Sequence, residues 1–385
     1  MTDQSPSRGM SSKDPVVKYF GSGPLRCHAW NSDRTLLAIS HNSNEVVIYS
    51  KSGNKYTAKH TLSEHTSTVT GIDWAPKTNR IVTCGADRNA FVWSFDQSLN
   101  EWKPILVLLR VNRACTLCRW SPKEDKFAVG TGARLVSICY FEEEHNWWIS
   151  KHIKKPIKST ITTLDWHPNN YLVATGCTDF KVRVFSAYIK EMETKPSPNE
   201  WGSRMPFGEL MYEYDNPKNQ TGWVHCVSFN HAGDKLAMVS HDSSVTIMAA
   251  SGDKVDTVFT SLQHLPFHSI IWISDQSLLA AGYDFDLRLL NYNGKEVKEL
   301  SSMQEASASK SNAGAGDNQH INAFKMFKQR DLTKADGVDD KAITTIHKNT
   351  IMELRIFAGD KSKATSVSSS GCDGRIVIWD TKRKL

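Results

Sequence analysis

The sequence contains no run of eighteen apolar residues, so it offers no segment long enough to cross a membrane as a helix. Its first residues, MTDQSPSRGMSSKD, lack the apolar core of a secretory signal. Its charge is also not strongly one-sided, because a formal net charge of +6 and a pI of about 8.7 are small for 385 residues. Such a mild excess does not by itself call for a nucleic-acid partner. These absences predict a soluble, intracellular protein.

Cysteine is present without the pattern of a disulfide framework. The eight cysteines are spread along the chain, mostly within strand-like runs, and we interpret them as small buried apolar residues. Cys115 and Cys118 have the spacing of a metal-ligand pair, but no second pair exists. Residues three apart on a strand point to opposite faces, so we expect no metal here.

The sequence also lacks a catalytic motif of high specificity. The segment GTGAR at 130–134 has no third glycine and stands between two expected strands, which favours a turn over a dinucleotide-binding loop. His, Ser or Thr, and Asp do occur together, as in a hydrolase triad. They recur at equivalent places in a repeat, however, with Trp as the fourth member. We therefore expect a protein that is not an enzyme and that needs no cofactor.

An internal repeat is the strongest positive signal. An aromatic residue ends the first expected strand of nearly every copy and recurs about every 45 residues, apart from two longer spacings. The anchor positions of the seven copies are Trp30, Trp74, Trp120, Trp166, Phe229, Trp272 and Ile356. Short alternating runs with turn residues between them predict antiparallel strands. Seven copies predict an all-β, seven-bladed WD40-type propeller as a single domain over residues 15–385.

Two copies carry four polar side chains that can form a buried hydrogen-bond chain. The second and last copies place them at matching offsets: His65, Thr83, Asp87 and Trp93, and His347, Ser369, Asp373 and Trp379. A buried carboxylate needs donors, which an imidazole, a hydroxyl and an indole can supply in sequence. We interpret both sets as structural tetrads. The other copies have lost members, and we expect sheet pairing and apolar burial to hold those blades.

The start of the chain divides into a tail and a strand. Residues 1–14 show no periodicity and are predicted to be a disordered tail. Residues 15–21 contain the strand-like run VVKYF. A strand standing before the first repeat can complete the last blade and remove its open edge, so we predict that role for it.

Two insertions interrupt the repeats. The first, at 186–221 after the fourth copy, is rich in Pro and Gly, and we expect an ordered loop packed by Trp201, Met205 and Phe207, with a strand near its end. The second, at 298–342 between the sixth and seventh copies, begins with a polar, small-residue stretch that predicts flexibility.

A short helix is predicted near residues 320–332 of the second insertion. Ile321, Phe324 and Phe327 recur there at helical spacing in a cationic setting. A helix outside the closed ring has no core for its phenylalanines, which makes it the best candidate for a partner-binding element.

Positive charge gathers in the third and fourth copies. Arg110, Arg113 and Arg119 are followed by KHIKKPIK at 151–158. One interpretation is a solvated rim, and the other is a docking surface for an acidic protein segment. Nucleic acid fits less well, because aromatic and basic residues do not interleave as in a nucleic-acid-binding module.

Several segments together resemble one known family. GIDWAPKTNRIVTCGADRNAFVW, KHIKKPIKSTI, FSAYIKEMETKPSP and WGSRMPFGELM are similar to the WD-repeat subunit of the actin-related protein 2/3 complex, and the resemblance runs from Cys27 to Asp380. It implies a non-enzymatic scaffold in a seven-subunit assembly that contains actin-related proteins 2 and 3 and nucleates branched actin filaments. It also implies contact with the mother filament, binding of acidic segments of nucleation-promoting factors, and a cytoplasmic location in cortical patches or leading-edge networks.

The resemblance assigns roles to individual residues. The filament contact of the family's inserted helix falls first on Phe327 and then on Phe324, with Ile321 and Met326 beside them. Phe324, Met326 and Arg330 differ from the usual family pattern. The acidic-segment site corresponds to the lysines of the basic stretch, Lys151, Lys154, Lys155 and Lys158. The alternative is a generic WD40 adaptor, such as a ubiquitin-ligase substrate receptor, which would need a further recruitment element for which the chain has no room.

Overall fold

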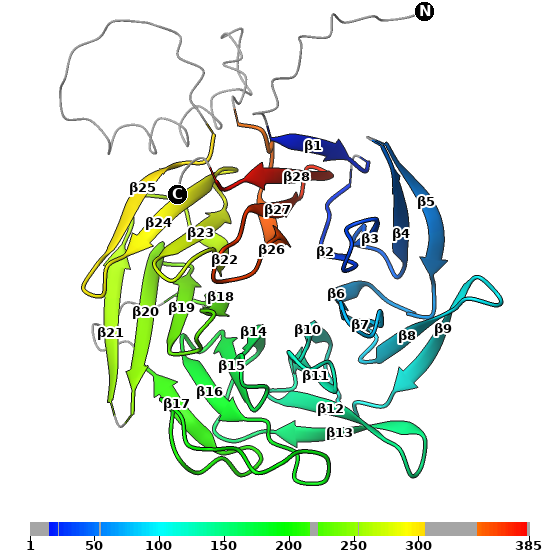
Figure 1. Ribbon diagram of the computed structural model, residues 1–385, viewed down its shortest axis with the longest axis horizontal. Helices are drawn as coiled ribbons and strands as arrows, with labels where there is room; N and C mark the ends of the chain where they lie inside the picture. The colour runs from blue at the N-terminus through cyan, green and yellow to red at the C-terminus, as the bar shows by residue number, and fades with distance from the viewer. Residues whose placement is uncertain are drawn as a thin grey trace, which may run out of the picture.

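The computed structural model describes residues 15–382, except residues 22, 54, 216–221, 253 and 305–344. In this part of the chain, twenty-eight strands form seven four-stranded antiparallel sheets. The sheets stand around one axis as the blades of a ring, and the chain passes from each blade to the next (Figure 1). The predicted all-β, seven-bladed propeller is therefore confirmed. No helix within the described ranges is long and apolar enough to span a membrane.

Each blade begins with its innermost strand and ends with its outermost strand. Blade one consists of β2 (Cys27–Trp30), β3 (Leu36–Ser40), β4 (Val46–Ser52) and β5 (Lys55–Leu62). Blade two consists of β6 (Val69–Trp74), β7 (Ile81–Gly85), β8 (Ala90–Asp96) and β9 (Glu101–Val107). Blade three consists of β10 (Cys115–Trp120), β11 (Lys126–Thr131), β12 (Val136–Glu142) and β13 (Trp147–Ile153). Blade four consists of β14 (Ile161–Trp166), β15 (Leu172–Cys177), β16 (Val182–Ser186) and β17 (Leu210–Tyr214).

The remaining blades follow the same plan, with one exception. Blade five consists of β18 (Val224–Phe229), β19 (Lys235–Ser240), β20 (Ser244–Ser251) and β21 (Lys254–Ser261). Blade six consists of β22 (Phe267–Trp272), β23 (Ser277–Gly282), β24 (Leu287–Tyr292) and β25 (Val297–Ser302). Blade seven takes three strands from the end of the chain and one from its start: β26 (Ile351–Ala358), β27 (Ser366–Gly371), β28 (Arg375–Asp380) and β1 (Val16–Tyr19).

The N-terminal strand closes the ring, as predicted. β1 pairs antiparallel with β28, with Val16 opposite Ile378. The next residue, Phe20, packs edge-on against two rings of blade one, Tyr49 and Tyr56, at centroid distances of 4.9 and 5.5 Å. Blade seven is therefore completed by β1 and joined to blade one by aromatic packing.

The core is divided into layers between neighbouring blades. Alternate residues on a strand point to opposite faces of the sheet, so Val92 and Trp93, adjacent on β8, belong to different layers. Val92 packs with residues of blade three, and Trp93 packs with residues of blade one. Six of the predicted aromatic anchors end the first strands of blades one to six. Because both faces of a blade are covered, its inner strands read as nearly continuous apolar runs.

The alternation rule used for Cys115 and Cys118 fails locally. The register of β10 against β11 shifts between Cys115 and Leu117, which marks a bulge. Both cysteines are consequently buried in the same layer, together with Cys84. All eight cysteines are free thiols. Among the residues that the structure describes, no group of His, Cys, Asp and Glu could hold a metal ion.

The first insertion supplies the outer strand of blade four. Trp201 and Met205 are buried in the layer between blades four and five, and Phe207 packs partly buried against the layer between blades three and four. The beginning of the insertion is held by Lys126, whose buried ammonium group lies 2.5 Å from Glu193 and donates to the carbonyl of Ala187 at 2.9 Å.

Two predicted segments fall outside the described residues. They are the tail at 1–14 and the helix near 320–332. The outer strand of blade six extends to Ser302, so it takes up the first residues assigned to the second insertion.

Candidate functional site

The predicted tetrads come together as continuous hydrogen-bond chains in two blades. In blade two, the His65 ring lies 2.8 Å from Asp87 through Nδ1 and 2.8 Å from Thr83 through Nε2. The Trp93 indole donates to Thr83 at 2.9 Å. The carboxylate only accepts, so Nδ1 carries the proton and Nε2 accepts from the hydroxyl. Thr83 is fully buried. It therefore cannot serve as an accessible nucleophile.

The tetrad of blade seven has the same order. The His347 ring lies 3.1 Å from Asp373 and 2.7 Å from Ser369, and the Trp379 indole donates to Ser369 at 2.8 Å. Burial alone would raise the pKa of Asp373, but the hydrogen bond and charge of His347, together with backbone N–H groups of Lys348 and Arg375, lower the pKa of the carboxyl. Both tetrads thus hold β-strands and turns within a blade.

Blade four uses a buried arginine in place of the missing tetrad histidine. Arg183 lies 2.9 Å from Asp179 and 2.6 Å from Glu213, which is its register partner on the outer strand. Its side chain is 2% exposed. Sequence reasoning missed this pair, although an arginine four residues after the turn aspartate was a readable signal.

Blade six repeats the arrangement around Arg288, which lies 3.3 Å from Glu299. His264 stands between Asp284 at 3.3 Å and Glu299 at 2.6 Å. The hydrogen bond to Asp284 and that to Glu299 together raise the pKa of His264, against the effect of burial. In both blades, an ion pair between an arginine and a glutamate on the outer strand takes the place of the hydrogen-bond chain that ends on tryptophan in the tetrads.

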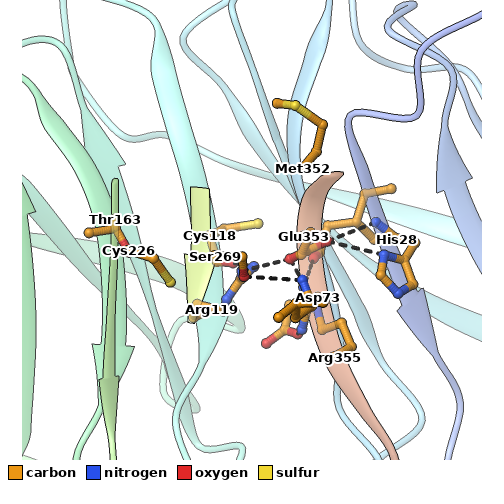
Figure 2. Close-up of polar contacts among 12 residues, drawn as sticks. His28, Asp73, Cys118, Arg119, Thr163, Cys226, Ser269, Met352, Glu353 and Arg355 are labelled. Carbon is orange, nitrogen blue, oxygen red and sulfur yellow. Dashed lines mark hydrogen bonds and ion pairs between the residues drawn. The ribbon is translucent and has the colours of Figure 1, made fainter. Parts of the chain in front are cut away.

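A charged network crosses the centre of the ring (Figure 2). Glu353 on β26 accepts from Arg119 at 2.7 Å, from Arg355 at 3.0 Å and from the backbone N–H of His28 at 3.0 Å. Arg355 also donates to Asp73 at 2.6 Å. Burial alone would raise the pKa of Glu353, but the two guanidinium groups hold it far below its ordinary value. The carboxylate is therefore charged at every physiological pH.

The network joins blades that are not neighbours. Blade seven adjoins blades six and one, yet its side chains reach Asp73 of blade two and Arg119 of blade three. Lys361, which follows β26, lies 2.6 Å from Asp165 of blade four. This finding corrects one interpretation, because Arg119 was grouped with basic residues of a solvated rim or a docking surface and instead points into the centre of the ring.

A cavity of about 530 Å³ lies beside this network. It is lined by the ends of the inner strands and by the turns that follow them, including Trp74, Pro76, Trp166 and Pro168. Acidic and basic side chains both line it, and the ion pairs described above join most of them. The arrangement supports rigidity and shows no acid–base pair poised for catalysis.

A second polar chain joins the first blade to the last. His28 is fully buried, with its ring nitrogens 3.0 Å from Ser370 and 2.9 Å from Ser368. The Trp30 indole donates to Ser368 at 3.0 Å. Sequence reasoning missed this chain, because its members come from opposite ends of the sequence.

The predicted basic stretch is divided in the structure. Lys151 lies on β13, 2.8 Å from Glu191 of the first insertion and near the Tyr140 ring. Lys154, Lys155 and Lys158 are exposed in the connection that follows β13. None of these three forms an ion pair with a described residue. The predicted filament-contact residues, Ile321, Phe324, Met326 and Phe327, all lie outside the described residues.

Comparison with known proteins identifies similar sequences over most of the chain. Family models match residues 56–94, as a WD domain with G-beta repeat, and residues 118–202, as the anaphase-promoting complex subunit 4 WD40 domain. Actin-related protein 2/3 complex subunit 1A-A of Xenopus laevis is 49% identical over 359 residues, which cover 93% of this chain and 94% of the relative. Actin-related protein 2/3 complex subunit 1 of Schizosaccharomyces pombe is 42% identical, over 91% of this chain and 95% of the relative. The Saccharomyces cerevisiae protein of the same name is 37% identical, over 96% of this chain and 98% of the relative.

Proposed function

Because this chain belongs to the family of actin-related protein 2/3 complex subunit 1, we propose that it acts as a scaffold that supports branched actin nucleation. It is a non-enzymatic subunit of that complex and works in the cytoplasmic actin cytoskeleton. One observation carries the proposal: the identity to the Xenopus laevis subunit covers 93% of the chain, so it includes all seven blades. Cortical patches or leading-edge networks are the proposed sites of action.

The scaffold role follows from the rigidity of the ring. Each blade buries both faces against its neighbours, and the polar network connects blade seven to blades one, two, three and four. Packed interiors deform little. Partners bound at different blades would therefore keep a fixed spacing, which a nucleator needs in order to hold actin-related proteins 2 and 3 and the smaller subunits in position.

The proposed filament contact is made by Phe327 and Phe324, with Ile321 and Met326 beside them. Burying two phenylalanines would contribute roughly 3 to 6 kcal/mol before ordering costs. One hydrogen bond joins the residues on either side of the undescribed segment: the Gln304 side chain, after blade six, accepts from the backbone N–H of Ile346 at 2.8 Å. This bond supports the proposal, because it holds the two ends of the segment close together. A contact of this strength is useful when it adds to others in the assembly.

The proposed site for acidic segments of nucleation-promoting factors is formed by Lys154, Lys155 and Lys158, with Lys151 at its border. The three exposed lysines have no acidic partner among the described residues, so their charge is available to a bound carboxylate. Lys151 is already paired with Glu191. It would contribute less, because an acidic segment has to displace that carboxylate first.

Gentle purification of the tagged chain from its own cytosol tests membership of the complex. We expect two actin-related proteins and the smaller subunits to co-purify at a constant ratio. A chain that purifies alone, or with ubiquitin-ligase subunits, would contradict the proposal and favour a generic adaptor.

Replacing Phe324 and Phe327 together with Ala tests the filament contact. We expect the purified complex to keep all its subunits and to form fewer branches in a fluorescence assay of actin assembly. Loss of subunits from the variant complex would show that these phenylalanines serve assembly instead.

A further inference from the structure

The first strand of each blade from two to seven contains a β-bulge near its start. In blades five and six, the strand register skips one residue at the bulge, His225 on β18 and His268 on β22. A bulge can re-aim the side chain of the extra residue. The cavity described above begins only with the next residues of these strands, Cys226 and Ser269, and extends to the turns at the strand ends. The two imidazoles therefore lie at the opposite end of the inner strands from those turns.

Five rings gather at this end of blades five and six. We call them the histidine cluster: Trp223, His225, His241, His268 and Tyr283. The His225 ring lies 2.9 Å from His241 through its Nε2 and stacks on His268 at a centroid distance of 5.3 Å. The Tyr283 ring contacts all three imidazoles edge-on. Trp223 is 54% exposed and packs against His241 at 5.7 Å. Because ring contacts join all five residues, they form one continuous surface.

The imidazoles of the cluster form no ion pair with a described residue. By contrast, both tetrad histidines and His264 lie within 3.3 Å of a carboxylate. Burial and the two neighbouring imidazoles lower the pKa of His225 to about 4. In the bond between His225 and His241, one nitrogen donates and the other accepts, so the pair keeps this bond with one extra proton but not with two. The cluster can therefore take up a single proton without losing its geometry.

The charged and titratable groups that border the cluster leave room for an external carboxylate. Burial and the charge of Arg26 lower the pKa of His268, while a backbone hydrogen bond and the charge of Glu353 oppose them. Glu353 is already bound by two guanidinium groups. Asp242 accepts hydrogen bonds from the backbone and side chain two residues further on. Cys372 is a neutral thiol, because burial raises its pKa.

The histidine cluster lies on the same face of the ring as the exposed lysines of the proposed acidic-segment site. Lys158 precedes β14, the first strand of blade four, just as Trp223 precedes β18, the first strand of blade five. The two strand starts are in contact, because Thr162 donates to the carbonyl of Val224 at 2.5 Å. A single extended segment can therefore run from the lysines to the cluster.

We propose that the histidine cluster binds a carboxylate of an acidic protein segment and takes up one proton when it does. The choice of partner rests on the proposed function, in which acidic segments of nucleation-promoting factors bind this chain. Trp223 offers an exposed apolar wall for the segment. Arg26 is exposed and has no acidic partner among the described residues, so it adds positive charge. A carboxylate beside an imidazole favours its charged form.

Proton linkage gives the sign of the pH dependence. The free cluster holds the pKa of His225 low, and a bound carboxylate raises it, so the bound state carries more protons. Affinity therefore rises as pH falls. We expect about fivefold tighter binding at pH 6.0 than at pH 7.5, within the limit of about tenfold per pH unit that one proton allows. Lysine, arginine and carboxylate side chains of ordinary pKa keep their charge in this interval.

Binding of a labelled acidic peptide to the assembled complex tests the cluster. The probe is the acidic segment of a nucleation-promoting factor, and its affinity is measured by fluorescence anisotropy at pH 6.0 and pH 7.5. We expect the double variant His225→Gln with His241→Gln to bind at both pH values as the wild type binds at pH 7.5. His241→Gln alone changes an exposed side chain and should lose at least half of the pH difference. It decides the test if the double variant does not assemble.

Two controls make the result specific. His231→Gln alters an exposed imidazole of the same blade, in the turn between β18 and β19 at the other end of these strands, and should keep the full pH difference. A peptide with Gln and Asn in place of every Glu and Asp should bind weakly and equally at both pH values. An equal pH difference with this neutral peptide would show that the cluster does not recognise a carboxylate, and the proposal would be wrong.

The outcomes also separate this proposal from the lysine site. Replacing Lys154, Lys155 and Lys158 with Gln should weaken binding at both pH values and preserve their ratio. Affinity of the wild type that does not depend on pH, or a pH difference that survives in the double variant, would overturn the cluster and leave the lysine site. If the wild type bound no acidic peptide at either pH, both acidic-segment proposals would fall, while co-purification would still decide membership of the complex.

Discussion

Single residues in this ring hold protonation states that depend on their neighbours. His225 on β18 lies 2.9 Å from His241 and stacks at 5.3 Å on His268, and the Tyr283 ring contacts all three imidazoles. Burial and the two neighbouring imidazoles lower the pKa of His225 from 6.5 to about 4. No carboxylate contributes to this shift, so no negative charge offsets the cost of protonating the His225 ring. The folded state therefore binds this proton less well than the unfolded state.

Substituting His225 should make the chain less sensitive to mild acid. Because the folded pKa is depressed, stability is lost as pH falls from about 6.5 to about 4. Allowing for partial solvent exposure, the loss at pH 5 is about 1 kcal/mol. We expect His225→Gln to lose less stability than the wild type between pH 7.5 and pH 5 in urea unfolding. The exposed His145→Gln is the control, and an equal pH response in all three proteins would contradict this account.

At the level of strands and blades, local patterns in the sequence carried most of the prediction. Alternating runs and repeated aromatic anchors were enough for seven blades, and VVKYF was recognised as the closing strand because no other strand could remove the open edge. The tetrad residues were readable because their offsets recur. The bulge near Cys115 could not be predicted from the sequence. One extra residue in a strand changes the sheet face to which the following side chains point, but it leaves the composition of the strand unchanged.

The closing strand β1 should be required for a stable ring. Deleting residues 2–20 removes β1 and Phe20, which leaves β28 with an open edge and Tyr49 and Tyr56 without their packing partner. Phe20 is partly buried, so the loss of its packing costs less than the about 3 to 5 kcal/mol of a fully buried phenylalanine. We expect a large fall in melting temperature and aggregation through the exposed strand. Deleting residues 2–14 is the control and should leave the melting temperature unchanged; equal loss in both would contradict the role of β1.

For the whole molecule, the polar network at the centre is the feature that sequence reasoning could not reach. Glu353 and Arg119 are 234 positions apart in the chain, and nothing in either local pattern indicates that they meet. Arg119 was therefore interpreted as part of a basic surface. A closed ring brings all inner strands to one axis, so charges that look like surface charges in the sequence can neutralise one another there.

Removing Glu353 should loosen several blades at once. Glu353→Ala leaves the partly buried Arg119 and Arg355 without their shared acid, which costs less than the about 3 to 5 kcal/mol of a fully buried ion pair. Arg119 lies on β10 of blade three, and Asp73, which pairs with Arg355, lies on β6 of blade two. Hydrogen exchange should therefore accelerate in β6 and β10 as well as in β26. Glu296→Ala, on the exposed turn of blade six, should leave exchange in these strands unchanged. Faster exchange confined to β26 would mean that the network stabilises blade seven alone, and the ring would then act as separate blades.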